Sequence, residues 1–274
     1  MPELPEIETL RRSLARSLPG RSIVRVEVRD RRLRTPVAAR ALRERVVAHR
    51  VEAVGRRSKY LLVHLDGGEV LIVHLGMSGR FVRVAHTAPI VAHTHVILGL
   101  DDDTELRFQD PRRFGMVFVV RHDDLATHPR FARLGPEPLA RDFDAQTLRD
   151  RAGRARKPIK NVLMDAHVVV GVGNIYACES LHRARINPRT PARRLSLLRW
   201  QRLHQAVREV LRQAVRDGGT TLQDFRDADG QYGAFQHRLQ VYDRAGEPCA
   251  RCGRSIRRIV QAGRGTFYCP GCQH

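Results

Sequence analysis

The last 26 residues hold four of the five cysteines, arranged in two pairs. Cys249 and Cys252 form the first Cys-x2-Cys pair, and Cys269 and Cys272 form the second, with 16 residues between them. This spacing is typical of a tetrahedral zinc site, because each tight turn supplies two thiolates and a β-hairpin can bring the turns together. Four cysteine ligands leave no open coordination position, so we predict one Zn²⁺ that folds the segment and performs no chemistry.

Two other interpretations of these cysteines are a pair of disulfides and a redox Cys-x-x-Cys site. Disulfides are disfavoured because the acidic N-terminal sequence MPELPEIETL lacks the basic and apolar regions of a secretion signal. A redox site would need only one pair. Cys178, flanked by apolar residues in IYACESL, is expected to be a small buried side chain.

The net charge of the chain indicates its partner. Among 274 residues, 49 Lys and Arg oppose 29 Asp and Glu, which gives a formal charge of +20. Clustered cations of this kind favour a polyanion such as nucleic acid; the alternative is an Arg-rich surface that is merely solvated. No run of 18 apolar residues is present, so we expect no membrane span and a cytoplasmic protein.

The apolar pattern changes period along the chain. Helical spacing from Ile7 to Leu18, followed by Gly20, predicts a helix over residues 5–18. From Val24 onward the period becomes two, which predicts the strands of an antiparallel sandwich or barrel. The expected strands cover residues 24–28, 59–65, 69–75, 95–100, 104–109 and 115–120.

From about residue 122 the pattern becomes helical. The clearest helix is expected over 195–217, with one broad apolar face made of Leu198, Trp200, Leu203, Val207, Val210, Leu211 and Ala214. Residues 218–238 form a long loop rich in Gly, Asp and Gln, which is unusual enough to indicate function. We therefore predict an α+β chain with a β-sandwich domain over 1–130, a helical domain over 131–238 and the zinc finger over 239–274.

The first residues could carry chemistry. Removal of Met1 would leave Pro2 with a free secondary amine, whose reference pKa of about 7.7–8.0 leaves roughly one group in ten neutral at pH 7. Attack of such an amine on an aldehyde-level carbon gives an iminium, which is an electron sink for elimination. Glu3 could then act as a general acid or base. The alternative is that an acidic first turn merely favours the helix that follows.

Three internal segments add cations and apolar side chains on turns. Lys59 lies in GRRSKYLL, and Met77 lies between glycines in HLGMSG. The sequence DPRRFG places Arg112, Arg113 and Phe114 on one turn. Met and Phe beside arginines are typical of wedges that enter a duplex and fill the space of an extruded base, although each loop alone would more often be ordinary packing.

These residues together resemble the bacterial formamidopyrimidine-DNA glycosylases, also called 8-oxoguanine DNA glycosylases. The matching stretches run in order through the whole chain, and their combination is very specific. They are PELPEIE at 2–8, RRSKYLL at 56–62, HLGMSG at 74–79, HTHV at 93–96, DPRRFG at 110–115, IK at 159–160, GVGNIYACESL at 171–181, GGTTLQDF at 218–225, QVY at 240–242 and the zinc segment at 248–272.

The resemblance implies a monomeric base-excision repair enzyme that removes oxidised purines from damaged double-stranded DNA and then cuts the strand. It implies a helix–two-turn–helix domain with GVGN as its turn, and a lesion-recognition loop at about 218–238. The implied catalytic residues are Pro2 as nucleophile, Glu3 as proton donor and acceptor, Lys59 for β-elimination and Arg264 for δ-elimination. The implied DNA contacts are Met77, His93, Arg112, Arg113, Phe114, Arg154, Lys160 and Asn174.

The chain departs from the family pattern at two positions. Gln223 stands where a cation is common, and Asp243 replaces a common glycine. Two other functions stay open: an endonuclease VIII-type glycosylase for oxidised pyrimidines, and a DNA-binding zinc protein without catalysis. Leu4 and the intact DPRRFG favour the purine enzyme, and an uncleaved Met1 would block the expected nucleophile.

Overall fold

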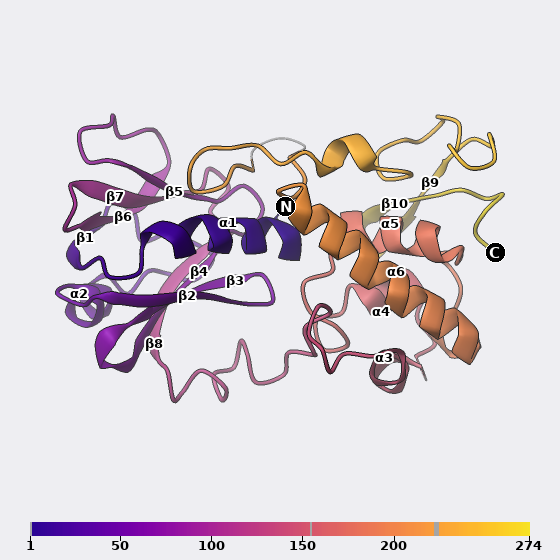
Figure 1. Cartoon of the computed structure of the whole chain (residues 1–274), viewed down its shortest axis with the longest axis horizontal. Helices are drawn as coiled ribbons and strands as arrows, with labels where there is room; N and C mark the ends of the chain where they lie inside the picture. Colours follow the sequence, from indigo (N-terminus) through magenta and orange to yellow (C-terminus); the bar gives the residue numbers. More distant parts are fainter. Residues whose placement is uncertain (1, 154, 222–224) are drawn as a thin grey trace. The chain divides into compact units, whose positions relative to one another are not determined.

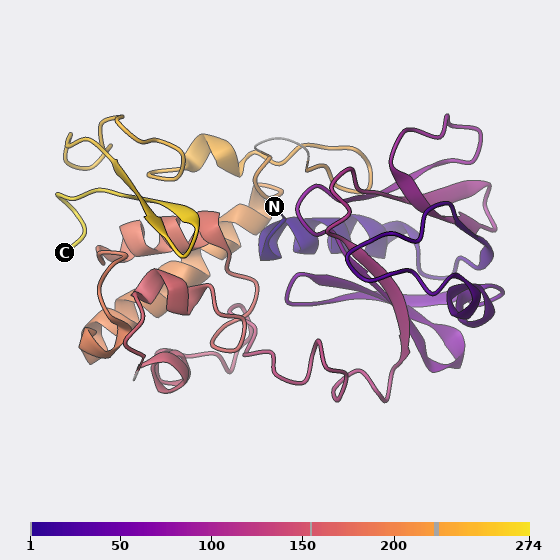
Figure 2. The ribbon, with the colours of Figure 1, turned by 180° about the vertical axis from the view of Figure 1, so that it is seen from behind.

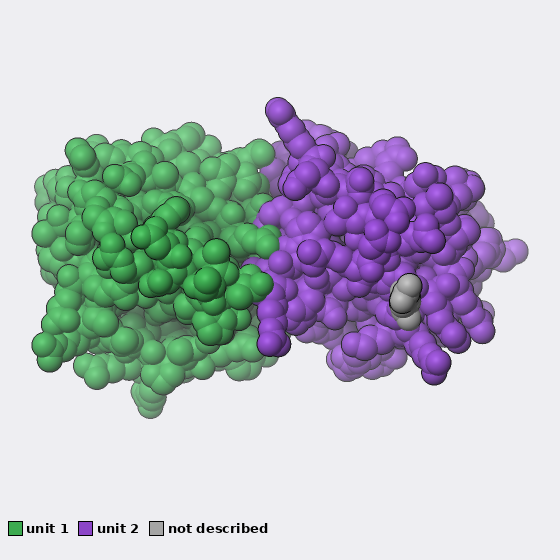
Figure 3. Space-filling model, turned by 90° about the horizontal axis from the view of Figure 1, so that it is seen from below, with its two compact units in different colours: residues 1–132, 217–234 green, residues 133–216, 235–274 purple. Residues whose placement is uncertain are grey.

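The chain folds into two compact units. The structure, a computed structural model, describes residues 2–153, 155–221 and 225–274. Unit 1 consists of residues 1–132 and 217–234, and unit 2 consists of residues 133–216 and 235–274 (Figure 3). Within the described residues, no helix is both long enough and apolar enough to span a bilayer.

Unit 1 is a sandwich of two four-stranded antiparallel sheets preceded by helix α1 (Leu4–Ser17) (Figure 1). The strand order is β1-β6-β7-β5 in one sheet and β2-β3-β4-β8 in the other. The fold class predicted for this part of the chain is confirmed. The strands are β1 (Ile23–Val28), β2 (Val51–Arg57), β3 (Tyr60–Leu65), β4 (Glu69–His74), β5 (Arg80–Ala85), β6 (Thr94–Leu100), β7 (Thr104–Gln109) and β8 (Met116–Arg121), joined by α2 (Ala39–Val46) and the 3₁₀ turn η1 (Asp66–Gly68).

Both sheets and α1 share one apolar core. Ile7, Leu10 and Leu14 of α1 are buried in the same cluster as Val63 of one sheet and Phe108 of the other. The helical spacing of the α1 residues puts them on one face, and the two-residue period of the strands does the same for each sheet. The burial of these apolar faces therefore fixes α1 against the sandwich.

The described residues of 217–234 belong to unit 1, whereas the sequence placed 218–238 in the helical domain. Glu6 of α1 accepts a hydrogen bond from the backbone N–H of Thr220. The hydroxyl of Ser13 donates to Asp229 at 2.6 Å, and the N–H of Arg83 donates to the carbonyl of Ala228 at 3.2 Å. These long-range contacts, absent from any local pattern, join the loop to the sandwich.

Unit 2 contains four α-helices and a β-hairpin among its described residues. Figure 2 shows the hairpin lying over α5. The expected hairpin between the cysteine pairs is confirmed. The elements are α3 (Ala145–Ala152), α4 (Ile159–Leu163), α5 (Asn174–Ala184), α6 (Leu197–Arg216), the 3₁₀ turns η2 (Ala192–Arg194) and η3 (Phe235–Arg238), and the hairpin strands β9 (Arg257–Gln261) and β10 (Arg264–Tyr268).

Two details of the helical prediction are wrong. Residues 122–144 form turns, so helical structure begins only at α3. Leu198 was expected on the apolar face of α6 but is 55% exposed, whereas Trp200 is 1% exposed. Two residues along a helix rotate the side chain by about 200°, which turns Leu198 away from the face that contains Trp200.

Candidate functional site

The first turn of α1 is held by Glu6. One carboxylate oxygen of Glu6 accepts the backbone N–H of Glu3 at 2.7 Å, and the other accepts the N–H of Thr220 at 2.7 Å. Pro2, Glu3 and Glu6 are all buried. Chain ends are usually frayed unless they are anchored. Glu6 therefore fixes the segment that contains the two predicted catalytic residues, a role that sequence reasoning did not assign to it.

Gly219 allows this anchoring. It has a φ of +83°, and a Cβ at this position would lie 2.9 Å from Oε1 of Glu6. A side chain there would both strain the backbone and press on the carboxylate. The sequence GGTT at 218–221 is thus explained by the approach of this segment to α1.

Lys59 is connected to α1 through Arg56. The guanidinium of Arg56 donates to Glu8 of α1 at 3.3 Å and to the carbonyl of Ser58 at 2.8 Å. Ser58 has a φ of +56°, and Lys59 follows it, half-buried, in the turn between β2 and β3. Burial raises the pKa of Glu8, but the nearby Arg11, Arg56 and Arg12 together lower it below its usual range. Arg56 therefore sets the turn that presents Lys59.

The turn after β4 presents Met77. Its side chain is 39% exposed, as expected for a residue that contacts something outside the chain. Gly76 has a φ of +62°, and a Cβ on it would lie 2.4 Å from the backbone of Phe114. The N–H of Gly76 donates to Nδ1 of His74 at 3.1 Å. The two turns that contain Met77 and Phe114 are therefore in direct backbone contact.

Asp110 connects three of the predicted DNA-contacting segments. This residue is fully buried, and its carboxylate accepts the Ser78 hydroxyl and the Gly115 N–H, both at 2.7 Å. Its backbone carbonyl accepts Nε2–H of His95 at 2.8 Å, and its N–H donates to the carbonyl of His93 at 3.0 Å. The carboxylate of Asp110 thus joins the turns of Met77 and Phe114, and its backbone groups join these turns to the start of β6.

The DPRRFG turn exposes an aromatic ring beside a cation. Phe114 is 43% exposed, and the guanidinium carbon of Arg112 lies 5.0 Å from the centre of its ring. Arg113 instead forms an ion pair with Asp30 at 2.8 Å. His93, at the start of β6, is exposed with a φ of +62°. Phe114, Arg112 and His93 are accessible to a ligand, whereas Arg113 is bound to protein.

In unit 2 the GVGN turn leads into α5. Gly171 has a φ of +79°, Gly173 is the N-cap, and Asn174 is the first helical residue, as the sequence predicts. The side-chain amide of Asn174 donates to the carbonyl of Gly265 at 2.9 Å. Nζ of the fully buried Lys160 donates to the Thr266 hydroxyl at 2.7 Å.

These two contacts place Lys160 and Asn174 against the hairpin that carries Arg264. Arg264 is exposed at the first position of β10, next to Gly265. The residues predicted to hold phosphates therefore also hold the hairpin turn. Their roles toward DNA stay predictions.

The four terminal cysteines fit a zinc ion. Their sulfur atoms all lie within 4.8 Å of one another, with 3.9 Å between Cys249 and Cys272 and 3.4 Å between Cys252 and Cys269. Tetrahedral Zn–S bonds of about 2.3 Å require sulfur separations of roughly 3.8 Å. Burial and the neighbouring sulfur atoms raise the pKa of the Cys272 thiol to about 12, so a cation is what makes four thiolates compatible here.

The remaining sequence predictions divide into three groups. Arg154 and Gln223 lie outside the described residues. Cys178 is buried as expected, in the apolar cluster that contains Cys249 and Cys269. Asp243 has a φ of +60°, a conformation that explains why glycine suits this position. Glu6, Glu8, Arg56 and Asp110 were not predicted; the only local signal was the Glu3–Glu6 spacing of a capping box.

Known families match most of the chain. The formamidopyrimidine-DNA glycosylase N-terminal domain matches residues 1–117, and the formamidopyrimidine-DNA glycosylase H2TH domain matches residues 134–226. The zinc finger found in FPG and IleRS matches residues 246–274. The last match agrees with the geometry of the four cysteines, which form one structural zinc site.

Full-length relatives and solved structures agree with the family models. The formamidopyrimidine-DNA glycosylase of Acidithiobacillus ferrooxidans is 50% identical over 273 residues, and that of Alkalilimnicola ehrlichii is 49% identical over 279 residues; both alignments cover 100% of each chain. The MutM (Fpg) protein of Thermus thermophilus superimposes with a TM-score of 0.89 at 44% identity, covering 99% of this chain and 98% of that one. Lactococcus lactis Fpg in complex with DNA that contains an abasic site gives a TM-score of 0.93 at 34% identity, covering 99% of each chain. This chain belongs to the formamidopyrimidine-DNA glycosylase family.

Proposed function

We propose that this chain excises oxidised purines, namely 8-oxoguanine and formamidopyrimidines, from duplex DNA and then cleaves the strand by β,δ-elimination. The observation that carries this proposal is the anchored first turn of α1. Glu6 accepts hydrogen bonds from the backbone of both Glu3 and Thr220, and Pro2 is buried. A held terminal amine can be a positioned nucleophile, whereas a frayed one cannot. Lactococcus lactis Fpg has been solved with Fapy-dG-containing DNA, which supports the same substrate class.

The proposed reaction starts at the amine of Pro2 after removal of Met1. Its nitrogen lone pair attacks C1′ of the damaged nucleotide, the glycosidic bond breaks, and the base leaves with a proton. Glu3 supplies and takes protons at the sugar. The attacking amine loses its proton, the C1′–O4′ bond opens as O4′ takes a proton from Glu3, and a Pro2–C1′ iminium forms. Loss of a proton from C2′ then supplies the electrons with which the C3′–O bond breaks in β-elimination. Loss of a proton from C4′ lets the C5′–O bond break in δ-elimination, and each phosphate leaves with the electron pair of its broken bond. Lys59 assists the first elimination and Arg264 the second.

Pro2 is favoured over Lys59 as the nucleophile by its reference pKa. A Lys amine has a reference pKa of about 10.4, some 2.5 units above that of a terminal amine. The terminal amine therefore has roughly 300 times more neutral form at pH 7 before any effect of its surroundings. The cation of Lys59 is better suited to hold a phosphate group than to attack a carbon.

Borohydride trapping tests the assignment, because it reduces the iminium to a stable covalent adduct. With DNA containing 8-oxoguanine, the chain that has lost Met1 should give an adduct whose mass locates Pro2. A chain with an extra residue before Pro2 should trap nothing, and Lys59→Ala should cleave slowly yet still trap. If the extended chain still forms the adduct and Lys59→Ala forms none, then Lys59 is the nucleophile.

Substrate preference separates the purine enzyme from the pyrimidine enzyme. Lactococcus lactis Fpg has been solved in complex with DNA that contains an oxidised pyrimidine, so both base classes need to be compared for this chain. We expect faster excision of 8-oxoguanine than of thymine glycol in otherwise identical duplexes. The reverse order would place this chain with the endonuclease VIII type.

We also propose that the enzyme acts as a monomer in the cytoplasm. One copy carries every residue of the proposed mechanism, from Pro2 to Arg264. Size-exclusion chromatography with light scattering, with and without a lesion duplex, should give one chain per particle. A dimer that cleaves faster than the monomer would contradict this proposal.

A further inference from the structure

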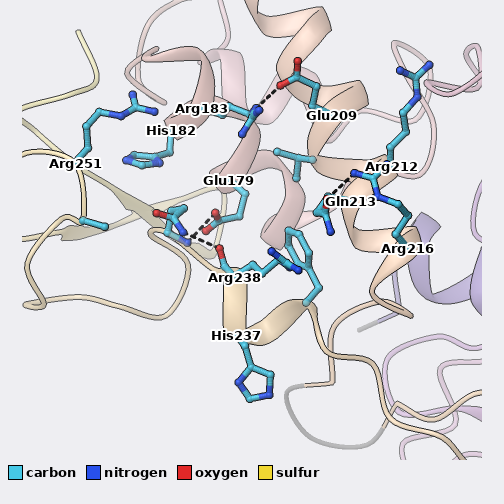
Figure 4. Close-up of a pocket in the computed structure, with 14 residues that line it drawn as sticks. Glu179, His182, Arg183, Glu209, Arg212, Gln213, Arg216, His237, Arg238 and Arg251 are labelled. Carbon is cyan, nitrogen blue, oxygen red and sulfur yellow. Dashed lines mark hydrogen bonds and ion pairs between the residues drawn. The ribbon is translucent and has the colours of Figure 1, made fainter.

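Unit 2 has a basic trough along α6 that the proposed glycosylase reaction does not use. The trough consists of two adjoining hollows, one of about 800 Å³ and one of about 510 Å³. Both are lined by Arg183, Glu209 and Arg251, so they form one continuous depression. Figure 4 shows the first hollow, with side chains from α5, α6, η3 and the segment that follows η3. We call this depression the α6 trough.

Positive charge dominates the lining. The larger hollow is lined by five arginines, namely Arg183, Arg212, Arg216, Arg238 and Arg251. The smaller hollow adds Arg185 and Arg202. Two carboxylates oppose them, Glu179 and Glu209. Glu179 is 3% exposed and accepts backbone N–H groups of residues 240–242. Among the described residues of the lining, Glu209 is therefore the one acid that is open to a ligand.

The three α6 arginines that line the trough, Arg202, Arg212 and Arg216, lie along one side of the helix. Arg202, Glu209, Arg212 and Arg216 follow one another at intervals of seven, three and four residues, which keeps them on one face. From Arg202 to Arg216 this face extends over about 21 Å at 1.5 Å per residue. Arg183 and Arg251 come from other segments of the same unit. Cations therefore line the depression from more than one side along much of its length.

The trough is distinct from the residues assigned to the lesion. Among the described residues that line the two hollows, none is Lys160, Asn174 or Arg264. Like charges from separate segments repel one another, and a concave surface of one sign concentrates the field of its charges. A bound anion would offset the repulsion among these arginines.

We propose that the α6 trough binds a chain of phosphate groups, independently of the lesion site. Guanidinium groups match phosphate oxygens in pairs, and seven of them over this length can contact several successive phosphates. Phe235 of the lining is only 4% exposed, so its ring is not available to stack on a base. The arginines are therefore the main groups that would recognise the ligand, through its phosphates.

Glu209 limits this binding. It forms an ion pair with Arg183 and accepts a hydrogen bond from Gln205 at 2.8 Å. The hydrogen bonds from Gln205 and Arg183 lower the pKa of Glu209, so it remains an anion at neutral pH. Its charge repels phosphate and competes for Arg183. Replacement of this one carboxylate should therefore strengthen phosphate binding.

Two probes distinguish the sources of a phosphate chain. Inorganic tripolyphosphate represents free oligophosphates, and a fluorescent ten-residue oligothymidylate represents a nucleic acid strand. Binding of each probe to the full zinc-loaded chain is measured by calorimetry and by anisotropy. Tighter binding of tripolyphosphate assigns the trough to free oligophosphates, and tighter binding of the strand assigns it to nucleic acid.

The key variant is Arg212→Gln with Arg216→Gln. Loss of two contacts to a single strand should weaken binding by about 25-fold at 0.1 M salt and reduce the slope of log K against log salt by about 1.4. The matched control, Arg193→Gln with Arg194→Gln, removes the same charge from exposed positions of unit 2 outside both hollows. It should change binding by less than about threefold.

Glu209→Gln should change probe affinity in the opposite direction to the Arg212–Arg216 variant. A gain in affinity cannot result from partial unfolding, so this variant separates binding from folding. We expect it to tighten both probes several-fold, which a merely solvated arginine surface does not predict. Cleavage of a short 8-oxoguanine duplex should be unchanged in the Arg212–Arg216 variant, so failure of the trough and failure of the glycosylase assignment are distinguishable. The proposal is overturned if neither probe binds, if both double variants lose binding equally, or if Glu209→Gln leaves binding unchanged.

Discussion

The hydroxyl of Ser78 donates a 2.7 Å hydrogen bond to the buried carboxylate of Asp110 and thereby joins the turns that contain Met77 and Phe114. The second oxygen of the same carboxylate accepts the N–H of Gly115. Because a carboxylate is only an acceptor, both turns supply donors and neither oxygen can be replaced by an amide nitrogen. The relative position of the two exposed apolar side chains therefore depends on this one buried acid.

Asp110→Asn should disturb both turns. The amide places a donor where either the Ser78 hydroxyl or the Gly115 N–H needs an acceptor, which should cost about 1–3 kcal/mol of unfolding free energy. Binding of a lesion duplex should weaken in parallel. Thermal unfolding and anisotropy measure the two effects, and the exposed Asp123→Asn is the control. Unchanged stability and affinity in Asp110→Asn would contradict the assignment.

The sequence predicted the elements whose pattern is local. The strand over 104–109 has the predicted bounds, and α1 begins within one residue of the prediction. Strand β2 was missed because a register shift between Val51 and Ala53 breaks its two-residue period. Local sequence pattern explains α1 and the strand over 104–109, whereas β2 is defined by its pairing with β3.

The candidate site shows the same division. Pro2, Lys59 and the four zinc ligands lie in motifs that can be recognised from adjacent letters. Glu6 anchors the first turn through a hydrogen bond with Thr220, which is 214 residues away in the sequence. Asp110 joins its two turns through a hydrogen bond with Ser78, which is 32 residues away. Contacts over such separations leave no periodic trace, so residues that position others were not found.

The stability of the sandwich should depend on pH through His74. Burial, with Lys59, Arg34 and Arg130 nearby, lowers the pKa of His74 to about 4. The unfolded chain, with a pKa near 6.5, therefore binds a proton over a range in which the folded chain does not. Neutral His74 therefore contributes to the free energy of unfolding, and this contribution is fully present above pH 6.5. It is lost as the pH falls toward 4, and the total loss is at most about 3 kcal/mol.

His74→Gln isolates this effect because glutamine does not titrate. Urea unfolding of both proteins from pH 4 to pH 7.5 should give a shallower pH dependence for the variant. Protonation at Nδ1 also removes the acceptor of the Gly76 N–H, so lesion binding by the wild type should weaken in the same acidic range. Parallel pH profiles for the two proteins would show that His74 does not titrate in this way.

Arg56→Lys tests how Lys59 is presented. A lysine keeps the charge, but its single ammonium cannot contact both Glu8 and the Ser58 carbonyl with the geometry of a guanidinium. We expect strand cleavage to slow by about tenfold with duplex affinity nearly unchanged, since small displacements of catalytic groups are costly. The control is Arg40→Lys, whose arginine pairs with Glu44 on the surface. A loss of affinity equal to the loss in rate would instead indicate a direct DNA contact by Arg56.

Zinc should be required for the hairpin but not for the sandwich. Cys249→Ala removes one of four ligands, so zinc content should fall from one ion per chain toward zero and amide protection in β9 and β10 should be lost. DNA binding should fail with the hairpin that carries Arg264. Cys178→Ala, a change at a buried cysteine that is not one of the four candidate zinc ligands, should retain zinc. Stoichiometric zinc in Cys249→Ala would contradict the four-cysteine site.

Met77 and Phe114 should matter for damaged DNA more than for intact DNA. Both side chains are large, apolar and more than one third exposed, on turns held together by Asp110. We expect Met77→Ala or Phe114→Ala to weaken lesion-duplex binding by about tenfold, because each removes apolar contact with an opened base stack. Binding of an undamaged duplex, which depends on phosphate contacts, should change by less than about twofold.

The control for these variants is Ile90→Ala. Ile90 is 47% exposed on a different loop of the same unit, so its truncation removes a similar apolar surface without altering the two turns. Equal losses on damaged and undamaged duplexes would show that Met77 and Phe114 act through general attraction. The double variant adds a sharper test, because two side chains that fill one space should lose less together than the sum of their separate losses. Strictly additive losses would place Met77 and Phe114 at separate sites on the DNA.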